Sequence, residues 1–432
     1  MSAAPSLEGG PRRTTTVGAI AAVAAVAALA AWAVWANAYR QPIDFRVYYL
    51  AAEAWAHGHD PYAMSRAAWF AFGHTLHIGR FVWPYRYPPY TAALLRPFIS
   101  FGEPAVRAAW QSASVASMVA AAWLAARALG GRWMYALAFL LLLIFAPAYD
   151  TLIVGQINGF LVLSLAVALW AIVRRRDRVL GVSLAVGTAL KLVPAALFVY
   201  FLAHRRWRAS AWFAIGLAVL TLLAVPLVGR HAFVGYAGWA VDLARPQLVM
   251  NGPTNVTFVG AMGRLFPHDL GLARTLGRLL GAGALLATVV VCRPRHDRPP
   301  DDLLAFSMIV ALLALLPPFT WYHQLITLLP PLLVVGQRLW RAGRWWELGL
   351  LGFLVAAADG TWILLNPAWW LGAKPPNVYY AISFPTLLCV VLWAICGLEL
   401  WRESHPAATE AQSGNVNPAA NTCSQAAATS GS

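Results

Sequence analysis

Long uncharged apolar stretches recur along this chain from Val17 to the region of Leu400. Of the 432 residues, 60% are hydrophobic and 11% are charged, whereas soluble domains carry about a quarter charged residues. Each stretch is long enough to cross a hydrocarbon core of roughly 30 Å, which takes about 20 helical residues. Because lipid offers no partner to backbone amides, such segments must be helical. We therefore predict an all-α integral membrane protein.

Arginine clusters between the apolar stretches predict the topology, because cytoplasmic loops are enriched in arginine and lysine. Alternating the stretches between the two sides gives ten full crossings with both termini in the cytoplasm. The predicted spans are about residues 17–36, 109–126, 133–149, 157–173, 210–228, 272–291, 303–316, 324–337, 347–366 and 381–400. Residues 1–16 form a cytoplasmic N-terminal segment, residues 17–402 the membrane domain, and residues 403–432 a disordered cytoplasmic tail.

The apolar segment 180–203 does not fit simple alternation, because arginine clusters lie on both sides of it. Both of its ends are therefore expected in the cytoplasm. We predict a re-entrant pair of half-helices that turns near Lys191 and Pro194, because proline interrupts a helix. Non-helical backbone at this depth is tolerated where protein surrounds it.

The predicted topology leaves four segments outside the cytoplasm, of which residues 37–108 form the largest loop. The other three are residues 150–156, 229–271 and 317–323. Most of the unusual polar residues lie in these segments, so we expect any chemistry at the extracytoplasmic face of the cell membrane.

The net charge of +15 does not indicate nucleic-acid binding, because the arginines lie in short clusters that set topology. The four cysteines have no metal-type spacing, and a disulfide framework is not expected. Histidines occur at His57, His59, His74 and His77, but no glutamate completes a zinc-protease motif. We predict no metal, no cofactor and no nucleic-acid partner.

Asp44 lies eight residues beyond the first predicted span, at the outer membrane interface. A partly desolvated carboxylate there can act as a general base, because loss of water raises its pKa. An ion pair between Asp44 and Arg40 or Arg46 is the alternative.

Residues 85–90 combine three tyrosines, Arg86 and two prolines. Aromatic rings can pack against the C–H faces of a sugar, and Arg86 can pair with a phosphate. Interfacial aromatic residues followed by the start of a helix are the alternative interpretation.

Four further residues carry polar side chains where apolar ones are expected. Gln156 and Asn158 precede a predicted helix, where their amides can bind sugar hydroxyls or cap the helix. Lys191 lies in an apolar segment without an acidic partner nearby in sequence, so it can bind a lipid phosphate or extend its amine to the interface. His323 lies at an outer helix start, where it can contact a phosphate or belong to the aromatic belt.

The order of these motifs resembles glycosyltransferase family 87, one of the C-type membrane glycosyltransferase families. The resemblance spans roughly residues 40–330 and rests on residues 44–48, 58–62, 85–89, 155–158, 190–194, 205–207, 255–257 and 321–323. The second of these segments reads Gly-His-Asp-Pro-Tyr, the fourth Gly-Gln-Ile-Asn and the last Trp-Tyr-His. The chain departs from the family pattern at Arg86 and Gln324, where relatives carry a small polar residue and a second histidine.

The resemblance implies transfer of mannose from a polyprenyl-phosphate sugar to a lipid or glycolipid acceptor, with inversion and without a required metal. It implies that Asp44 is the general base and that Lys191, Arg86 and His323 bind the donor phosphate. The residues implied to bind sugar or acceptor are Tyr48, Tyr62, Tyr87, Gln156, Asn158 and Asn255.

Other functions stay open at this stage. The sugar can be arabinofuranose or glucose, since the motifs do not separate these donors. A lipid-linked sugar transporter is a second possibility, although such proteins show internal repeats and charged residues near the membrane midplane. A non-enzymatic subunit of a cell-envelope complex is a third, for which Asp44 would be dispensable.

Overall fold

The computed structural model describes residues 11–40, 42–78, 83–244, 255–294, 300–358 and 384–404. These residues form an all-helical protein, which confirms the predicted fold class. Their one β-type contact is an isolated bridge between Asn255 and Trp321. The predicted N-terminal segment and C-terminal tail lie largely outside the described residues, as does the end of the predicted helix 347–366.

In chain order the helices are α1 (Pro11–Tyr39), α2 (Ile43–Ala56), α3 (Arg66–Thr75), α4 (Pro89–Leu95), η1 (Arg96–Phe101), α5 (Glu103–Leu129), α6 (Arg132–Ile144), α7 (Ala146–Val154), α8 (Asn158–Val173), α9 (Asp177–Leu190), α10 (Ala195–Ala203), α11 (Trp207–Val228), α12 (Arg230–Ala244), α13 (Phe258–Leu265), α14 (Leu270–Val291), α15 (Asp302–Leu315), η2 (Tyr322–Leu328), α16 (Leu329–Arg341), α17 (Trp345–Ala356) and α21 (Phe384–Ser404). The elements η1 and η2 are 3-10 helices.

Among the described residues, five helices are long and apolar enough to cross a membrane: α1, α5, α11, α14 and α21. The pair α6 and α7 makes a sixth candidate if its 52° bend is counted within one span. The protein is therefore a multi-pass membrane protein. The prediction of ten full crossings is not confirmed, because several apolar segments form shorter, bent or broken helices. The apolar helices α8, α15 and α17 have 10–17 residues each.

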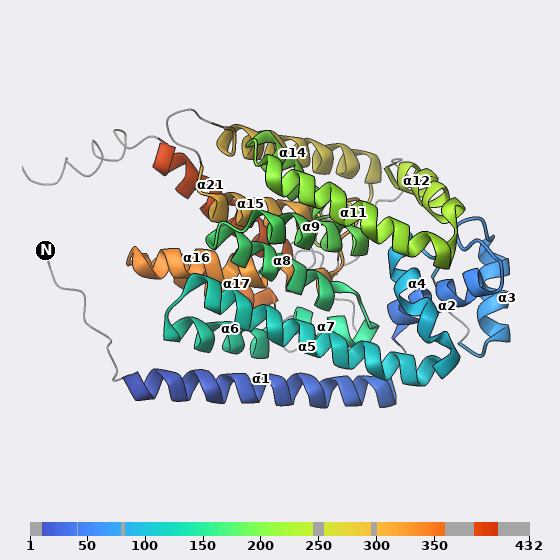
Figure 1. Cartoon of the computed structure of the whole chain (residues 1–432). Helices are drawn as coiled ribbons and strands as arrows, with labels where there is room; N and C mark the ends of the chain where they lie inside the picture. The colour runs from blue at the N-terminus through green and yellow to red at the C-terminus, as the bar shows by residue number, and fades with distance from the viewer. Residues whose placement is uncertain are drawn as a thin grey trace, which may run out of the picture.

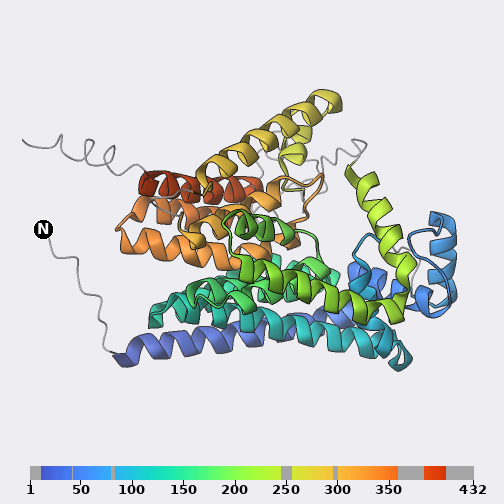
Figure 2. The ribbon, with the colours of Figure 1, turned by 45° about the horizontal axis from the view of Figure 1, so that its top comes forward.

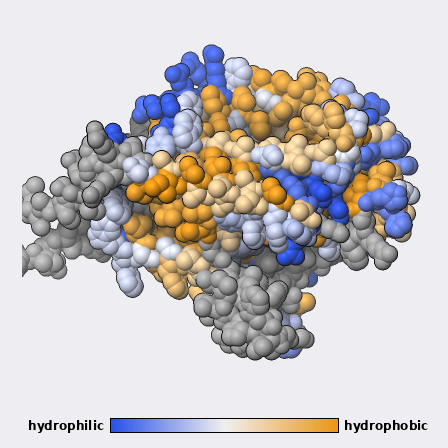
Figure 3. Space-filling view, turned by 90° about the horizontal axis from the view of Figure 1, so that it is seen from below, coloured by the Kyte–Doolittle hydropathy of each residue, from blue (hydrophilic) through white to orange (hydrophobic). Residues whose placement is uncertain are grey.

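Most helices run along a common direction, with α1 at one edge of the bundle and α14 at the opposite edge (Figure 1). Helices α2, α3 and α4 and helix α12 gather at the end of the bundle where α1 finishes, as Figure 2 also shows. We call this end the helical cap, meaning residues 42–78, 83–101 and 230–244. The side of the bundle seen in Figure 3 carries wide hydrophobic areas, as expected for a surface that contacts lipid.

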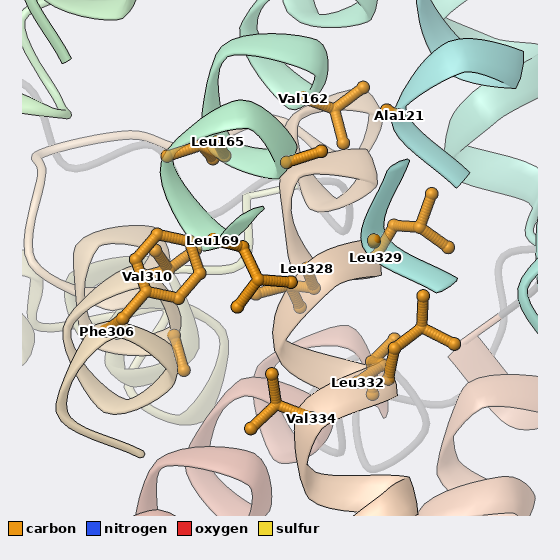
Figure 4. Packing of buried hydrophobic residues seen from close by; sticks show 14 of the residues in the cluster. Ala121, Val162, Leu165, Leu169, Phe306, Val310, Leu328, Leu329, Leu332 and Val334 are labelled. Atoms are coloured by element: carbon orange, nitrogen blue, oxygen red, sulfur yellow. The ribbon is translucent and has the colours of Figure 1, made fainter. Parts of the chain in front are cut away.

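The bundle core is formed by α5, α8, α15, η2 and α16. Figure 4 shows the side chains that meet there: Ala121, Val162, Leu165, Leu169, Phe306, Val310, Leu328, Leu329, Leu332 and Val334. Glycines allow close helix contact, as is common in membranes. A Cβ atom on Gly181 of α9 would lie 2.2 Å from the carbonyl oxygen of Ala209 in α11. Helices α9 and α11 therefore pack with their backbones nearly in contact.

The predicted interruption near Lys191 and Pro194 is confirmed. Helix α9 ends at Leu190, Lys191 is extended with φ −158° and ψ 131°, and Pro194 precedes α10. The Nε atom of Arg206, just after α10, donates to Asp177 at the start of α9 over 3.1 Å. The pair α9–α10 thus returns to the end of the bundle at which it began.

Ion pairs join several helices at this end, away from the helical cap. Arg206 binds Asp302 at the start of α15 over 2.8 Å. Arg338 of α16 binds Glu403 of α21 over 2.9 Å and also contacts Asp301. One end of the bundle is therefore held by charge pairs, while the functional candidates lie toward the other end.

Candidate active site

Asp44 lies in the first turn of α2, against the turn that joins α7 to α8. Gly155 ends α7 in the left-handed conformation with φ 69°. A Cβ atom on Gly155 would lie 2.6 Å from Cβ of Phe45 and 2.9 Å from Cβ of Pro42. Glycine is needed here both for the positive φ and for this close approach. The contact places Gln156 beside Asp44.

The Asp44 carboxylate accepts two hydrogen bonds from side chains. Tyr87 Oη donates to Oδ1 over 3.3 Å, and Gln156 Nε2 donates to Oδ2 over 3.0 Å. The alternative ion pairs are not what the structure shows among its described residues. Arg46 pairs with Glu103 over 3.6 Å, and the Arg40 guanidinium lies over the Trp35 ring at 5.0 Å. The carboxylate is thus held by neutral partners.

Gln156 is the centre of this hydrogen-bond network and is buried. Its Oε1 atom accepts from the Tyr48 hydroxyl and from the backbone N–H of Ile157, which fixes the orientation of the amide. Its Nε2 atom faces three acceptors, namely Asp44, Tyr87 Oη at 2.9 Å and His323 Nε2 at 3.2 Å. Because a primary amide has two N–H bonds, it can satisfy only two of them at once.

His323 completes the other side of the network. Its Nδ1 atom lies 3.4 Å from Oδ2 of Asp150, and its ring is buried. Thr151 Oγ1 and Asn158 Nδ2 donate to its backbone carbonyl over 3.0 and 3.3 Å, which holds η2 against α7 and α8. A carboxylate this close to Nδ1 favours the tautomer with the proton on Nδ1, which leaves Nε2 to accept from Gln156.

The sequence did not lead us to Asp150, although its position carried a usable signal. It is an acidic residue at the end of an apolar stretch, five residues before the glycine of the Gly-Gln-Ile-Asn motif. An acid that a helix places next to a motif-bearing turn is a candidate partner for any histidine brought there by the fold. His323 is too distant in sequence for that pairing to be foreseen.

Lys191 extends the network to a small cavity. Its Nζ atom donates to Oδ1 of Asn158 over 3.3 Å. The cavity is lined by polar groups of Lys191, Asn158 and Gln324 and by aliphatic side chains that include Leu161 and Leu197. The lining thus places one cation and two side-chain amides beside aliphatic groups.

Burial raises the pKa of Asp44 above its ordinary value of 3.8, because the carboxylate has lost much of its water. The charges of His323 and Lys191 and the hydrogen bond from Tyr87 lower the pKa, and Asp150 raises it, but desolvation is the largest effect. The result is a carboxylate that holds a proton more tightly than it would in water, as a general base must.

The other predicted site residues lie outside this network. Arg86 is an exposed residue, and partial loss of water around its guanidinium, together with the charge of Arg66, lowers the pKa of Arg86. It is not hydrogen-bonded to Asp44, His323 or Lys191 in the described structure. Tyr62 touches the network indirectly, because its hydroxyl donates to the Tyr87 carbonyl over 2.5 Å.

Asn255 is fully buried in a contact between two loops. Its Oδ1 atom accepts from Thr257 Oγ1 over 3.1 Å and from the backbone N–H groups of Thr257 and Thr320 over 3.3 and 3.1 Å. Its backbone carbonyl accepts from Arg264 over 2.7 Å. This side chain joins the loop before α13 to the loop that leads to His323, and a sugar contact from it stays a prediction.

Comparison with known proteins identifies relatives that are named as mannosyltransferases. The chain is 28% identical over 317 residues to the polyprenol-phosphate-mannose-dependent alpha-(1-2)-phosphatidylinositol mannoside mannosyltransferase of Mycobacterium tuberculosis, covering 69% of this chain and 71% of the relative. It is 28% identical over 322 residues to the corresponding pentamannoside mannosyltransferase of Mycolicibacterium smegmatis, covering 70% of this chain and 76% of the relative.

The sequence profile of glycosyltransferase family 87 matches residues 85–318, which is more than half of the 432 residues. The matched part contains Tyr87, Gln156 and Lys191, while Asp44 precedes it and His323 follows it. The chain therefore belongs to glycosyltransferase family 87, and it is a membrane-embedded glycosyltransferase.

Proposed function

We propose that the protein transfers mannose from polyprenyl-phosphate mannose to a lipid or glycolipid acceptor, with inversion, at the outer face of the cell membrane. The names of its relatives support both the donor and the class of acceptor. The observation that carries the proposal is the Asp44 carboxylate, which has a raised pKa and lies in one hydrogen-bond network with His323 and Lys191.

In this reaction Asp44 takes the proton from an acceptor hydroxyl. The hydroxyl oxygen forms a bond to the anomeric carbon of the donor sugar, and the bond between that carbon and the phosphate oxygen breaks. The electron pair leaves with polyprenyl phosphate. Tyr87 and Gln156 hold the carboxylate by hydrogen bonds, so that one of its oxygens is directed at the incoming hydroxyl.

Lys191 and His323 would stabilise the charge that develops on the leaving phosphate. A fixed cation such as Lys191 contributes strongly to catalysis in a site with little water, so the proposed reaction requires no metal. The aliphatic side chains beside Lys191 would accommodate the first part of the polyprenyl chain. Sugar contacts are assigned to Tyr48, Tyr62, Tyr87, Gln156, Asn158 and Asn255, and a phosphate contact to Arg86, as the family resemblance implies.

The side of the membrane follows from charge. Arg174, Arg175 and Arg205 lie in connections at the end of the bundle where α9 begins and α10 finishes. An excess of arginine marks cytoplasmic loops. The helical cap and Asp44 lie toward the opposite end, which we assign to the extracytoplasmic side. In this proposal α9–α10 is the re-entrant pair and ten further segments cross the membrane.

The test compares the wild type with Asp44→Asn, both purified in lipid nanodiscs. The donor is polyprenyl-phosphate-[14C]mannose, and a membrane lipid extract supplies acceptors. Glu53→Gln is the matched control, because it makes the same acid-to-amide change on α2 and Glu53 makes its ion contact with His57 instead. We expect label in lipid products with the wild type and with Glu53→Gln, and a loss of at least 100-fold with Asp44→Asn.

Equal rates for Asp44→Asn and the wild type would remove Asp44 from the chemistry. Transfer of glucose or arabinofuranose but not mannose would change the donor and keep the reaction class. Retention of configuration in the product would contradict direct displacement.

A further inference from the structure

An aromatic series runs from α12 to the Asp44 network. The Trp239 and Tyr236 rings stack with centroids 5.9 Å apart and an interplanar angle of 24°. The Tyr236 ring lies 6.0 Å from that of Tyr62, whose hydroxyl binds the Tyr87 backbone. Tyr87 in turn donates to Asp44. Consecutive contacts therefore connect the surface of α12 with the general base.

The two aromatic residues at the outer end of this series keep unused hydrogen-bond donors. Within the described part of the chain, neither the Tyr236 hydroxyl nor the Trp239 indole N–H has a hydrogen-bond partner, and both residues are partly buried with some surface left open. Other aromatic residues of the helical cap behave differently. Tyr85 donates to the carbonyl of Pro88, and the Trp69 indole N–H donates to that of Trp83. Tyr236 and Trp239 thus combine ring faces with free O–H and N–H groups.

The position of the series relative to the charges indicates which substrate it faces. The network extends from Asp44 through Gln156 to His323 on one side, and the cation Lys191 lies beyond it. The aromatic series joins at the backbone of Tyr87, whose hydroxyl contacts both Asp44 and Gln156. Among the described residues, the rings of Tyr236 and Trp239 contact neither His323 nor Lys191. In a displacement with inversion, the nucleophile and the leaving group occupy opposite sides of the anomeric carbon. Since the leaving phosphate is assigned to Lys191 and His323, we assign the aromatic series to the acceptor.

We propose that Tyr236 and Trp239 form a binding platform for sugar residues of the acceptor, which rests on the proposed function of Asp44. The C–H faces of a hexose pack on the rings, and its hydroxyls accept from the two free donors. The ligand class is a mannose-containing saccharide that continues outward from the attacking hydroxyl. The platform selects acceptors that already carry sugar over bare phospholipid.

Simple packing of α12 on the helical cap does not account for this pair. That packing is provided by Phe233, whose ring meets Tyr90 edge-on at 5.2 Å, and by Gly235, which lies against Tyr62. A Cβ atom on Gly238 would meet nothing within 4 Å, so α12 is not packed against a neighbour at that position. Phe233 offers a matched control, since its removal weakens the attachment of α12 without changing the platform.

The experiment uses full-length protein in phosphatidylcholine nanodiscs, which avoids sugar-based detergents. Binding of methyl α-mannobioside is measured by saturation-transfer NMR, and transfer of labelled mannose is measured with a glycolipid acceptor. The variants are Trp239→Ala, Tyr236→Phe and the control Phe233→Ala. For Trp239→Ala we expect the Kd for the disaccharide and the KM for the acceptor to rise roughly tenfold, with kcat within about twofold. Tyr236→Phe keeps the ring and should show a smaller rise.

Unchanged binding by Trp239→Ala overturns the platform, as does equal weakening by Phe233→Ala, which would show that α12 packing is responsible. Failure of the wild type to bind methyl α-mannobioside overturns it as well. If the wild type binds the disaccharide through Trp239 but transfers no mannose, the platform stands and the proposed reaction fails.

Discussion

The Nδ1 atom of His323 lies 3.4 Å from Oδ2 of Asp150, so a 3-10 helix late in the chain is joined to α7 beside the general base. The histidine is buried, while the carboxylate is one-third exposed. This geometry makes Asp150 a positioning residue for His323 and not a second base, because the histidine lies between it and Gln156.

We therefore expect Asp150→Asn to lower kcat by roughly tenfold with little change in the KM for the acceptor. The neutral amide no longer selects the His323 tautomer as the carboxylate does. His323→Gln should cost more than Asp150→Asn. In a double-mutant cycle, Asp150→Asn should add little once His323 is replaced. Full additivity would show that Asp150 acts independently of the histidine.

The raised pKa of Asp44 predicts how activity depends on pH. The base works only as carboxylate, so kcat/KM should fall as the pH drops through a midpoint above 3.8. Desolvation sets this direction, and therefore Tyr87→Phe, which removes a hydrogen bond that favours the charged form, should move the midpoint to higher pH. A midpoint that stays in place in Tyr87→Phe would indicate that another group limits the rate.

The raised pKa of Asp44 also predicts how the folding stability depends on pH. A carboxyl whose pKa is raised by folding contributes stability below its unfolded pKa, and this contribution is lost as the pH rises through the folded pKa. The difference in Tm between Asp44→Asn and the wild type should therefore change in favour of the variant between about pH 4 and neutral pH. A difference that is constant over this range would contradict the assignment of the raised pKa to Asp44.

Asn255→Ala should destabilise the protein. The change leaves the buried N–H groups of Thr257 and Thr320 without the Oδ1 acceptor, which costs about 1–3 kcal/mol for each buried unpaired group. Asn255→Asp keeps an oxygen at this position and should retain more stability. Thermal unfolding in nanodiscs distinguishes this from sugar binding, for which Asn255→Ala would keep its Tm and raise the KM.

Gly181→Ala should separate α9 from α11. The new methyl group would lie 2.2 Å from the backbone oxygen of Ala209, and backbone cannot yield as a flexible side chain can. We expect a large loss of folded protein by size-exclusion chromatography. Gly349→Ala in α17 is the control, because its Cβ atom would meet nothing within 4 Å and alanine favours a helix. Equal yields of both variants would refute the close packing.

Sequence reasoning predicted the features that depend on local chemistry. Apolar stretches predicted an all-helical membrane protein, and the proline after Lys191 predicted the interruption between α9 and α10. The number of membrane crossings was harder to predict, because apolar composition does not reveal a bend such as the one between α6 and α7. A 3-10 helix in place of the start of the predicted helix 324–337 is equally invisible to hydropathy.

The candidate site was partly predictable for the same reason. Asp44, Tyr87, Gln156 and His323 were singled out as polar residues at helix ends, and the structure brings them together. The sequence could not reveal which polar groups face one another. Arg86 stands between Tyr85 and Tyr87 in the sequence, yet it is exposed while Tyr85 is buried and Tyr87 reaches Asp44. Asn255 was grouped with the sugar ligands by the family resemblance, and its contact with Thr320 could not be foreseen because that residue lies in a loop distant in sequence.

Without substrate, the Gln156 amide has two N–H groups but faces three hydrogen-bond acceptors. Several arrangements of hydrogens are therefore close in energy before substrate arrives, and none holds Asp44, Tyr87 and His323 together. When the acceptor substrate binds, its hydroxyl donates a hydrogen bond to Asp44. Gln156 can then donate its two N–H groups to Tyr87 and His323. Binding of the acceptor substrate thereby fixes the hydrogen bond to His323, which is assigned to the phosphate of the sugar donor. We therefore expect the two substrates to bind cooperatively.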